Sequence, residues 1–418
     1  MDYSRIGACQ RCLCRLFATA AVLSAAAVQA RPMTFAEALA DARSAPSIAA
    51  RAAQSDAARS AAIASDRLPD PKLEVGLQDF PVTGPNAGSF TRDNFTMLKV
   101  GVSQEFPNPA KRRARLGRAQ ADIGAAQAAT AVEARDVKVQ TALAWTDLYF
   151  AERRLQTLKS LDDSIDDISG TVAARLASGS ARPAQALEPQ QLKADVGDRR
   201  SDLLAQAGKA RVELTRWTGD PMPEVAGAPP DWAINPSLLR ANIDALPSLL
   251  AADATTAQAE ADVRLARAEK RPDWEVSANY GRRDPSYGDL ASVAVKIDLP
   301  FFSRRRQDPI IAARLSEADS ARLEREAARR QALATLQADL ADHAMHHDRY
   351  MRARDVLVPL ARKRAELDRV GYAANTVDLG TALEGTYELA KVELDALDRE
   401  ATVVRDGIRI NLTYGSDR

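Results

Sequence analysis

The sequence has few of the residues that usually carry thiol, metal or catalytic chemistry. Among 418 residues there are three cysteines and three histidines, and aromatic residues make up only 5%. No Ser-His-Asp order with a supporting context and no glycine-rich phosphate loop is present. We therefore predict that the protein is not an enzyme, that it has no catalytic or cofactor-binding residues, and that it uses no cofactor.

All three cysteines lie in a segment with the pattern of a secretory signal. Cys9, Cys12 and Cys14 stand among three arginines that precede an apolar run and a small-residue cleavage site: Arg5, Arg11, Arg15, Leu16–Val28 and Val28-Gln29-Ala30. We expect residues 1–30 to be removed, which leaves neither disulfides nor thiol chemistry. The remaining chain has a formal charge of −2, which gives no reason to expect nucleic acid. No later apolar run approaches the roughly 18 residues that a membrane helix requires.

The stretch Phe95–Arg118 joins a strand pattern directly to a long helical pattern. Its apolar residues alternate with polar or small ones up to Phe106, and the two prolines Pro107 and Pro109 then end the strand. The basic turn Lys111-Arg112-Arg113 opens the helix. A strand of about ten residues with one apolar face has the size of a membrane β-strand.

The chain repeats one order of elements twice: helix, strand, strand, long helix, shorter helix. We predict a first repeat at 31–236 and a second at 237–418. The predicted membrane strands are 72–80, 95–106, 274–281 and 291–299. The predicted helices are Thr34–Arg67 with a Thr34–Glu37 capping box and a kink at Pro46, Ala110–Leu176, Ala184–Trp217, Ser237–Arg271, Asp308–Val370, and a last helix that ends near Leu412.

Two features of the first repeat predict how its helices pack. The spacing of Leu161, Ile165, Ile168 and Val172 is typical of a coiled-coil seam. The two shorter predicted helices together match the longest one in length, so they can flank it end to end. Because unpaired strand edges cannot face lipid and small membrane barrels have about eight strands, four strands per chain also imply an oligomer.

The motif Ser103-Gln104-Glu105-Phe106-Pro107-x-Pro109-x-Lys111-Arg112, together with the duplication, resembles the TolC-like outer-membrane efflux proteins, also called outer membrane factors. The similarity runs from Thr34 to the C-terminus and is greatest to the branch that serves heavy-metal-cation pumps. It implies a mainly α fold with a small transmembrane β part: a twelve-stranded barrel shared by a homotrimer, continued by a long α-helical barrel through the periplasm. It also implies a passive duct that contacts outer-membrane lipid, a periplasmic adaptor protein and an inner-membrane pump of the resistance-nodulation-division type.

The same resemblance implies functional positions in this chain. The two hairpin tips that would contact the adaptor include Arg175, Leu176, Gly179, Arg369, Val370, Gly371 and Tyr372. Asp378 resembles an acidic position that constricts the closed periplasmic end. From the strand alternation itself we expect Lys99, Glu105, Lys296 and Asp298 to face the lumen, where their mixed signs favour a wet pore with little ion selectivity.

The histidines leave two interpretations open. His343, His346 and His347 share one helical face, at a spacing that can hold a transition-metal ion. However, His343 and His347 also continue the heptad seam of Leu333, Leu336 and Leu340, and we assign no resident metal site. Two other functions remain open as well: a duct for drug efflux or type I protein secretion, and a soluble periplasmic coiled-coil scaffold.

Overall fold

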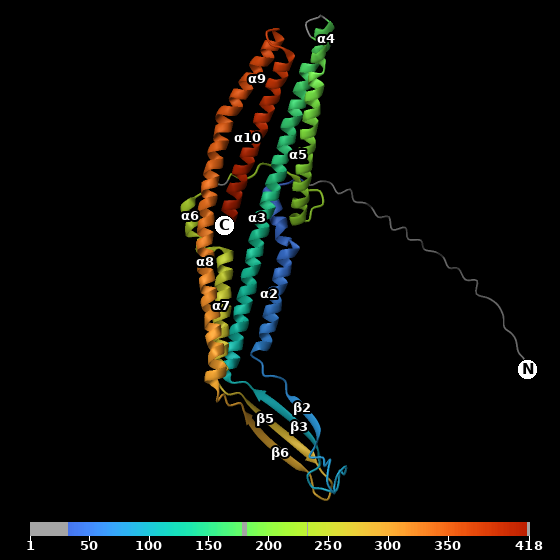
Figure 1. Ribbon diagram of the computed structural model, residues 1–418, viewed down its shortest axis with the longest axis vertical. Helices are drawn as coiled ribbons and strands as arrows, with labels where there is room; N and C mark the ends of the chain where they lie inside the picture. Colours follow the sequence, from blue (N-terminus) through green and yellow to red (C-terminus); the bar gives the residue numbers. More distant parts are fainter. Residues whose placement is uncertain (1–31, 178–181, 232, 416–418) are drawn as a thin grey trace, which may run out of the picture.

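The computed structural model describes residues 32–177, 182–231 and 233–415 (Figure 1). Long helices lie side by side in a rod, and a small β-sheet extends from one end of it. The predicted signal segment and the predicted tip residue Gly179 lie outside the described residues.

The first repeat opens with two helices separated by a proline break. Helix α1 (Phe35–Asp41) has the predicted capping box: the Thr34 amide donates to Glu37 Oε2 at 2.8 Å, and the Glu37 amide donates to Thr34 Oγ1 at 3.3 Å. After a short 3₁₀ turn, helix α2 (Pro46–Ser65) begins. Ala45 is extended at φ −56° and ψ 135°, because a proline disfavours the α conformation in the residue before it. The position of the predicted irregularity at Pro46 is confirmed, but the chain forms two helices there rather than one kinked helix.

The second repeat breaks at the corresponding place, so the predicted single helix Ser237–Arg271 is wrong. The structure has α6 (Pro236–Ala241), a 3₁₀ turn (Ile243–Ala245) and α7 (Pro247–Ala268). Leu246 is extended at φ −62° and ψ 134°, as the proline that follows it requires. Both repeats therefore use the residue before a proline to separate a short helix from a longer one.

Helix α3 (Pro109–Ser169) is the axis of the first repeat. Its 61 residues make a rod of about 90 Å. The prediction of an unbroken helix to Leu176 is wrong: the helix ends at Gly170, and α4 (Val172–Ala177) follows a turn, since glycine is a poor helix former. The predicted seam is confirmed, because Leu161, Ile165, Ile168 and Val172 are all buried.

The long helix of the second repeat starts earlier than predicted. Helix α8 (Ser303–Arg352) contains Pro309 in its second turn, so the prediction of a start at Asp308 is wrong. Pro309 removes only one backbone hydrogen bond there, at an exposed position where water can replace it. A π-helical turn (Ala353–Leu357) then leads into α9 (Val358–Ala373).

The shorter helices flank the long ones end to end. Helix α2 packs against the sheet-proximal half of α3, and α5 (Glu188–Thr218), which follows a 3₁₀ turn at Pro183–Ala186, packs against its other half (Figure 1). Helices α7 and α10 (Leu379–Tyr414) take the same places along the second long helix. Both also contact α3, which joins the two repeats into one rod.

The four strands form one antiparallel sheet in the order β2-β3-β5-β6. Their bounds are Lys72–Gln78, Met97–Phe106, Trp274–Arg282 and Leu290–Ile297, close to the predicted ranges. The central pairing, β3 with β5, connects the two repeats.

The largest buried side chain lies in the middle of the rod. Trp145 is fully buried, meets Phe35 edge to face at 5.4 Å between ring centroids, and donates from Nε1 to the Met33 carbonyl at 2.9 Å. Met33 belongs to a two-stranded parallel pair, β1 (Pro32–Met33) with β4 (Glu224–Val225), that the sequence did not predict. This contact fastens the start of the described chain to α3.

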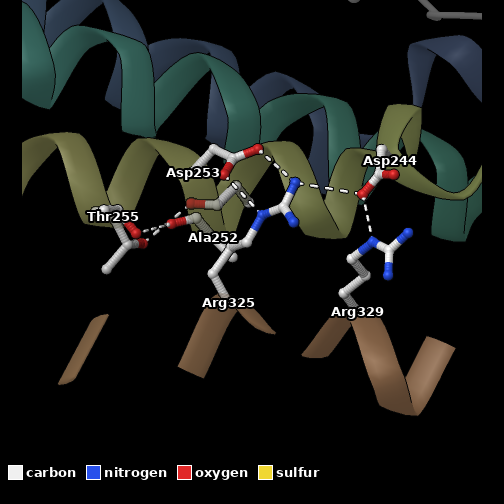
Figure 2. A network of polar contacts seen from close by, with 8 residues as sticks. Asp244, Ala252, Asp253, Thr255, Arg325 and Arg329 are labelled. Carbon is white, nitrogen blue, oxygen red and sulfur yellow. Dashed lines mark hydrogen bonds and ion pairs between the residues drawn. The ribbon is translucent and has the colours of Figure 1, made fainter. Parts of the chain in front are cut away.

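Charged pairs align α8 with α7 and with the 3₁₀ turn Ile243–Ala245 that precedes α7 (Figure 2). Arg325 Nε lies 2.9 Å from Asp253 Oδ1, and its Nη2 lies 3.4 Å from Asp244 Oδ1. Arg329 Nε also bonds Asp244 Oδ1, at 2.9 Å. Because these groups are partly exposed, they specify alignment more than they add stability.

Candidate functional site

One face of the sheet is apolar and uncovered. The outward side chains of the two edge strands, β2 and β6, are between 45% and 76% exposed: Leu73, Val75, Leu77, Val293, Val295 and Ile297. The sheet extends beyond the helices, so no helix lies over this face (Figure 1). An apolar patch of this size and regularity marks a surface that contacts lipid or another protein.

The opposite face carries charges in a row across all four strands. Glu105 on β3 stands opposite Glu275 on β5, which stands opposite Lys296 on β6. Lys72 on β2 forms an ion pair with Glu105, and Lys99 Nζ lies 3.5 Å from Glu74 Oε1. The predicted lumen residues Lys99, Glu105 and Lys296 therefore share one face of the sheet.

Asp298, the fourth predicted lumen residue, lies just beyond the end of β6. Its amide donates to the Asp273 carbonyl at 2.9 Å. The structure thus brings it to the junction between the sheet and the helices rather than into the row of charges.

A buried asparagine organises this junction, and the sequence did not single it out. Asn108 caps α3 by accepting the Lys111 amide at 2.8 Å on Oδ1. Its Nδ2 donates to Asp273 Oδ1 at 2.9 Å and to the Arg271 carbonyl at 3.3 Å, and Lys111 Nζ reaches Asp273 Oδ2 at 2.8 Å. The Asn108 side chain of the first repeat is thereby hydrogen-bonded to the segment of the second repeat that leads into β5.

The first hairpin tip lies at the far end of the rod from the sheet (Figure 1). Arg175 and Leu176 both belong to α4. Leu176 is partly buried against the apolar cluster that runs between α3, α5 and α10. Gly179 is not among the described residues.

The second hairpin tip is described in full. Arg369 forms an ion pair with Glu366 at 3.0 Å, and Val370 is 52% exposed. The Gly371 carbonyl accepts the Thr376 amide at 2.9 Å, and a Cβ on Gly371 would lie 2.5 Å from Val377 Cγ2. The close turn therefore requires glycine at this position.

Tyr372 connects the two hairpins. Its ring is buried, and its hydroxyl lies 3.1 Å from Oγ1 of Thr171, the residue that follows Gly170 at the end of α3. The sequence placed Tyr372 at a tip but gave no signal for this partner, which is 201 residues away. The contact forms a hydrogen-bonded latch between the ends of the two repeats.

Asp378 is the N-cap of α10. Its Oδ1 accepts the Thr381 amide at 2.8 Å, and this hydrogen bond holds the pKa of the carboxyl below its ordinary value. The positive charge of Arg182, which precedes the 3₁₀ turn before α5, also lowers the pKa of this carboxyl. An ionised carboxylate therefore stands near the hairpin tips.

The three histidines do not point to one common centre. His346 Nδ1 lies 2.7 Å from Asp406 Oδ2 on α10, whereas the rings of His343 and His347 are 6.3 Å apart. His343 Nδ1 is buried without a hydrogen-bond partner, and burial lowers the pKa of this imidazole. Within the described residues, no group of three or more His, Cys, Asp or Glu side chains is arranged to hold a metal ion.

Among the described helices, none combines the length and the apolar character needed to cross a membrane.

Sequence similarity to a known protein covers part of the chain. No family model matches the chain. The cobalt-zinc-cadmium resistance protein CzcC of Cupriavidus metallidurans is 23% identical over 244 residues, which cover 57% of this chain. The aligned region spans only about half of that relative's length, 56%.

Solved structures match over almost the whole chain. CusC superposes with a TM-score of 0.79 at 13% identity and covers 91% of this chain and 92% of its own. The open state of the Neisseria gonorrhoeae MtrE outer-membrane channel gives a TM-score of 0.75 at 15% identity, with 91% and 89% covered. The chain therefore has the fold of the TolC-like outer-membrane channel structures.

Proposed function

We propose that the chain is the outer-membrane exit duct of a tripartite efflux system and conducts passively, without catalysis. The observation that carries this proposal is the sheet with one exposed apolar face and one charged face, placed at the end of a rod of about 90 Å. The apolar face fits lipid and the charged face fits a wet lumen. The rod then extends from the outer membrane into the periplasm.

A homotrimer completes the pore. Each chain supplies four strands, and both edge strands, β2 and β6, have a free edge within the described sheet. Edges of this kind must be paired in lipid, so β6 of one copy joins β2 of the next. Three copies give the twelve strands of a closed barrel.

The hairpin tips meet a periplasmic adaptor, which connects the duct to an inner-membrane pump of the resistance-nodulation-division type. Val370 offers an exposed apolar contact at the second tip, and Arg175 and Leu176 lie at the first. Asp378 and the Tyr372–Thr171 latch keep this end closed until the adaptor binds.

Heavy-metal cations are the proposed cargo. The support is the relative named for cobalt, zinc and cadmium resistance. Conduction requires no resident metal site, and His343, His346 and His347 serve in helix packing and pairing.

Membrane fractionation tests the duct itself. The protein should sediment with outer membranes and run as a trimer that dissociates to monomer only on heating. A monomer released with the periplasmic fraction would instead support a coiled-coil scaffold.

A resistance assay tests the cargo. A variant with a charged residue on the apolar face of the sheet should no longer insert in the membrane. Cells that carry it should have lower resistance to cobalt, zinc or cadmium and a higher content of that metal. If resistance to drugs or secretion of a protein falls instead, the duct serves one of those systems.

A further inference from the structure

The two repeats differ at the turn that joins the sheet to the long helix. In the second repeat, the chain passes from β6 through Leu299, Phe301 and Phe302 before α8 begins. These three side chains are 57%, 79% and 78% exposed. Leu299 continues the alternation of Val293, Val295 and Ile297, the apolar stripe of β6, and the exposed rings of Phe301 and Phe302 follow in the turn. Exposed apolar side chains therefore reach the helical end of the sheet.

The corresponding turn of the first repeat is closed by internal contacts. Phe106 stacks on Trp274 with ring centroids 4.4 Å apart, and Pro107 is buried. Lys111 pairs with Asp273 at 2.8 Å, and Arg112 pairs with Asp66 at 3.4 Å. The aromatic ring and two of the three basic groups, Lys111 and Arg112, therefore already have partners, whereas Arg113 is exposed.

The basic groups of the second turn have no such partners. Arg304, Arg305 and Arg306 are all exposed, and none of them makes an ion pair within residues 32–177, 182–231 and 233–415. Three guanidinium groups, which bind phosphate strongly, lie next to two exposed phenylalanine rings, which suit the interface of a membrane.

We propose that this turn, Leu299–Arg306, binds the phosphate headgroups of anionic phospholipids at the inner surface of the membrane. The inference rests on the proposed function, because the apolar stripe must face lipid. Phe301 and Phe302 enter the interfacial layer, and the three arginines meet the phosphates that lie at that depth. Charge complementarity and the continuity with the apolar stripe favour a lipid over a protein partner.

The rival occupant is a neighbouring copy of the chain. Because β6 is an edge strand, the turn lies near the β2 entry of the next copy, where Asp70 is exposed. If the arginines paired there, their removal would weaken the trimer in the absence of any lipid.

The test uses the purified full-length trimer in detergent and three variants. The first is Arg304→Gln with Arg305→Gln and Arg306→Gln, and the second is Phe301→Ser with Phe302→Ser. A control removes three exposed charges from the helical hairpin: Lys159→Gln, Arg200→Gln and Lys209→Gln. Retention of phosphatidylglycerol and phosphatidylcholine is measured by native mass spectrometry, with inorganic phosphate as a separate competitor.

The wild type and the control should retain phosphatidylglycerol in preference to phosphatidylcholine. The triple arginine variant should lose this preference, with affinity falling roughly fivefold for each arginine removed. The phenylalanine variant should weaken retention of both lipids. Inorganic phosphate should not displace the lipid.

Three results would overturn the inference: unchanged phosphatidylglycerol retention in the arginine variant, displacement by inorganic phosphate, or loss of the trimer in lipid-free detergent. In each case the protein would still fractionate with outer membranes. Failure of the wild type to fractionate there would instead refute the proposed function.

Discussion

At the scale of single residues, Asn108 makes the most consequential polar contacts. It combines a helix cap with donors to the second repeat, and it is buried. We expect Asn108→Ala to lower the free energy of unfolding by about 2–3 kcal/mol, because a cap is lost and buried acceptors lose their donor. Thermal unfolding followed by circular dichroism measures the change.

Asn108→Asp distinguishes the role of Asn108 as a helix cap from its role as a donor to the second repeat. Aspartate retains the cap acceptor but brings a second carboxylate next to Asp273. We therefore expect it to be destabilising as well. If Asn108→Asp were as stable as the wild type, the donors to Asp273 and Arg271 would be unimportant.

The latch at the hairpin tips gives a prediction about conduction. Tyr372→Phe removes only the hydroxyl that contacts Thr171, so stability should change by about 1 kcal/mol or less. Single-trimer conductance in a planar bilayer should rise severalfold, because the closed end is released. Tyr387→Phe is the matched control, since this residue packs on the same apolar cluster without a described hydrogen bond. Equal conductance in the two variants would refute the latch.

His343 predicts a pH dependence of stability. Burial holds its pKa below 6.5, while Asp406, His346 and His347 act on it with opposing signs. As the pH falls through the unfolded value, the unfolded chain takes up a proton before the folded protein does, so stability decreases. His343→Gln should reduce the drop in unfolding temperature between about pH 7 and about pH 5.5. An unchanged drop in the His343 variant would contradict the assignment.

The sequence identified some of these residues but not their partners. Lys111 and Tyr372 belong to visible motifs, so they could be selected in advance. Asp273 and Thr171 could not, because their roles arise from contacts 162 and 201 residues away in the chain. Asn108 occupied an unspecified position of its motif, and only its contacts, an acceptor to the Lys111 amide and a donor to Asp273 and Arg271, explain why it is asparagine.

At the scale of elements, we expect the two faces of the sheet to differ in whether they tolerate a charged substitution. Val102→Lys places a charge on the apolar face near the middle of β3, which costs about 2–4 kcal/mol in a bilayer. We expect this variant to disappear from the outer-membrane fraction. Ser277→Lys, on the charged face of the adjacent strand, should insert normally. Equal insertion of both variants would show that the apolar face does not contact lipid.

Strands and helix breaks differed in how well the sequence predicted them. The alternation in β3 and β6 is regular, so both strands lie close to their predicted ranges. Pro46 was recognised as a break but Pro247 was not, although each acts on the residue before it in the same way. The π turn at Ala353–Leu357 is followed by Pro359, which has no amide to donate to the preceding turn, so the prediction of one regular helix from Asp308 to Val370 overlooked a local signal.

At the scale of the whole molecule, the duplication was visible because both repeats preserve the order and lengths of their elements. β3 and β5 pair at the same junction, because β3 ends where α3 begins and β5 begins where α7 ends. The ion pairs of Figure 2 were not predictable, because charged residues at exposed helical positions have many possible partners. The sequence therefore specified the architecture better than it specified the contacts that align it.

The row formed by Lys72, Glu105, Glu275 and Lys296 contains two positive and two negative groups. In the proposed trimer this row would occur three times and form a belt with no net charge, which would favour neither cations nor anions. A conduit of this kind contributes no discrimination of its own. Selection among solutes then belongs to the machinery that loads the conduit, and one such conduit can serve loaders with different cargoes.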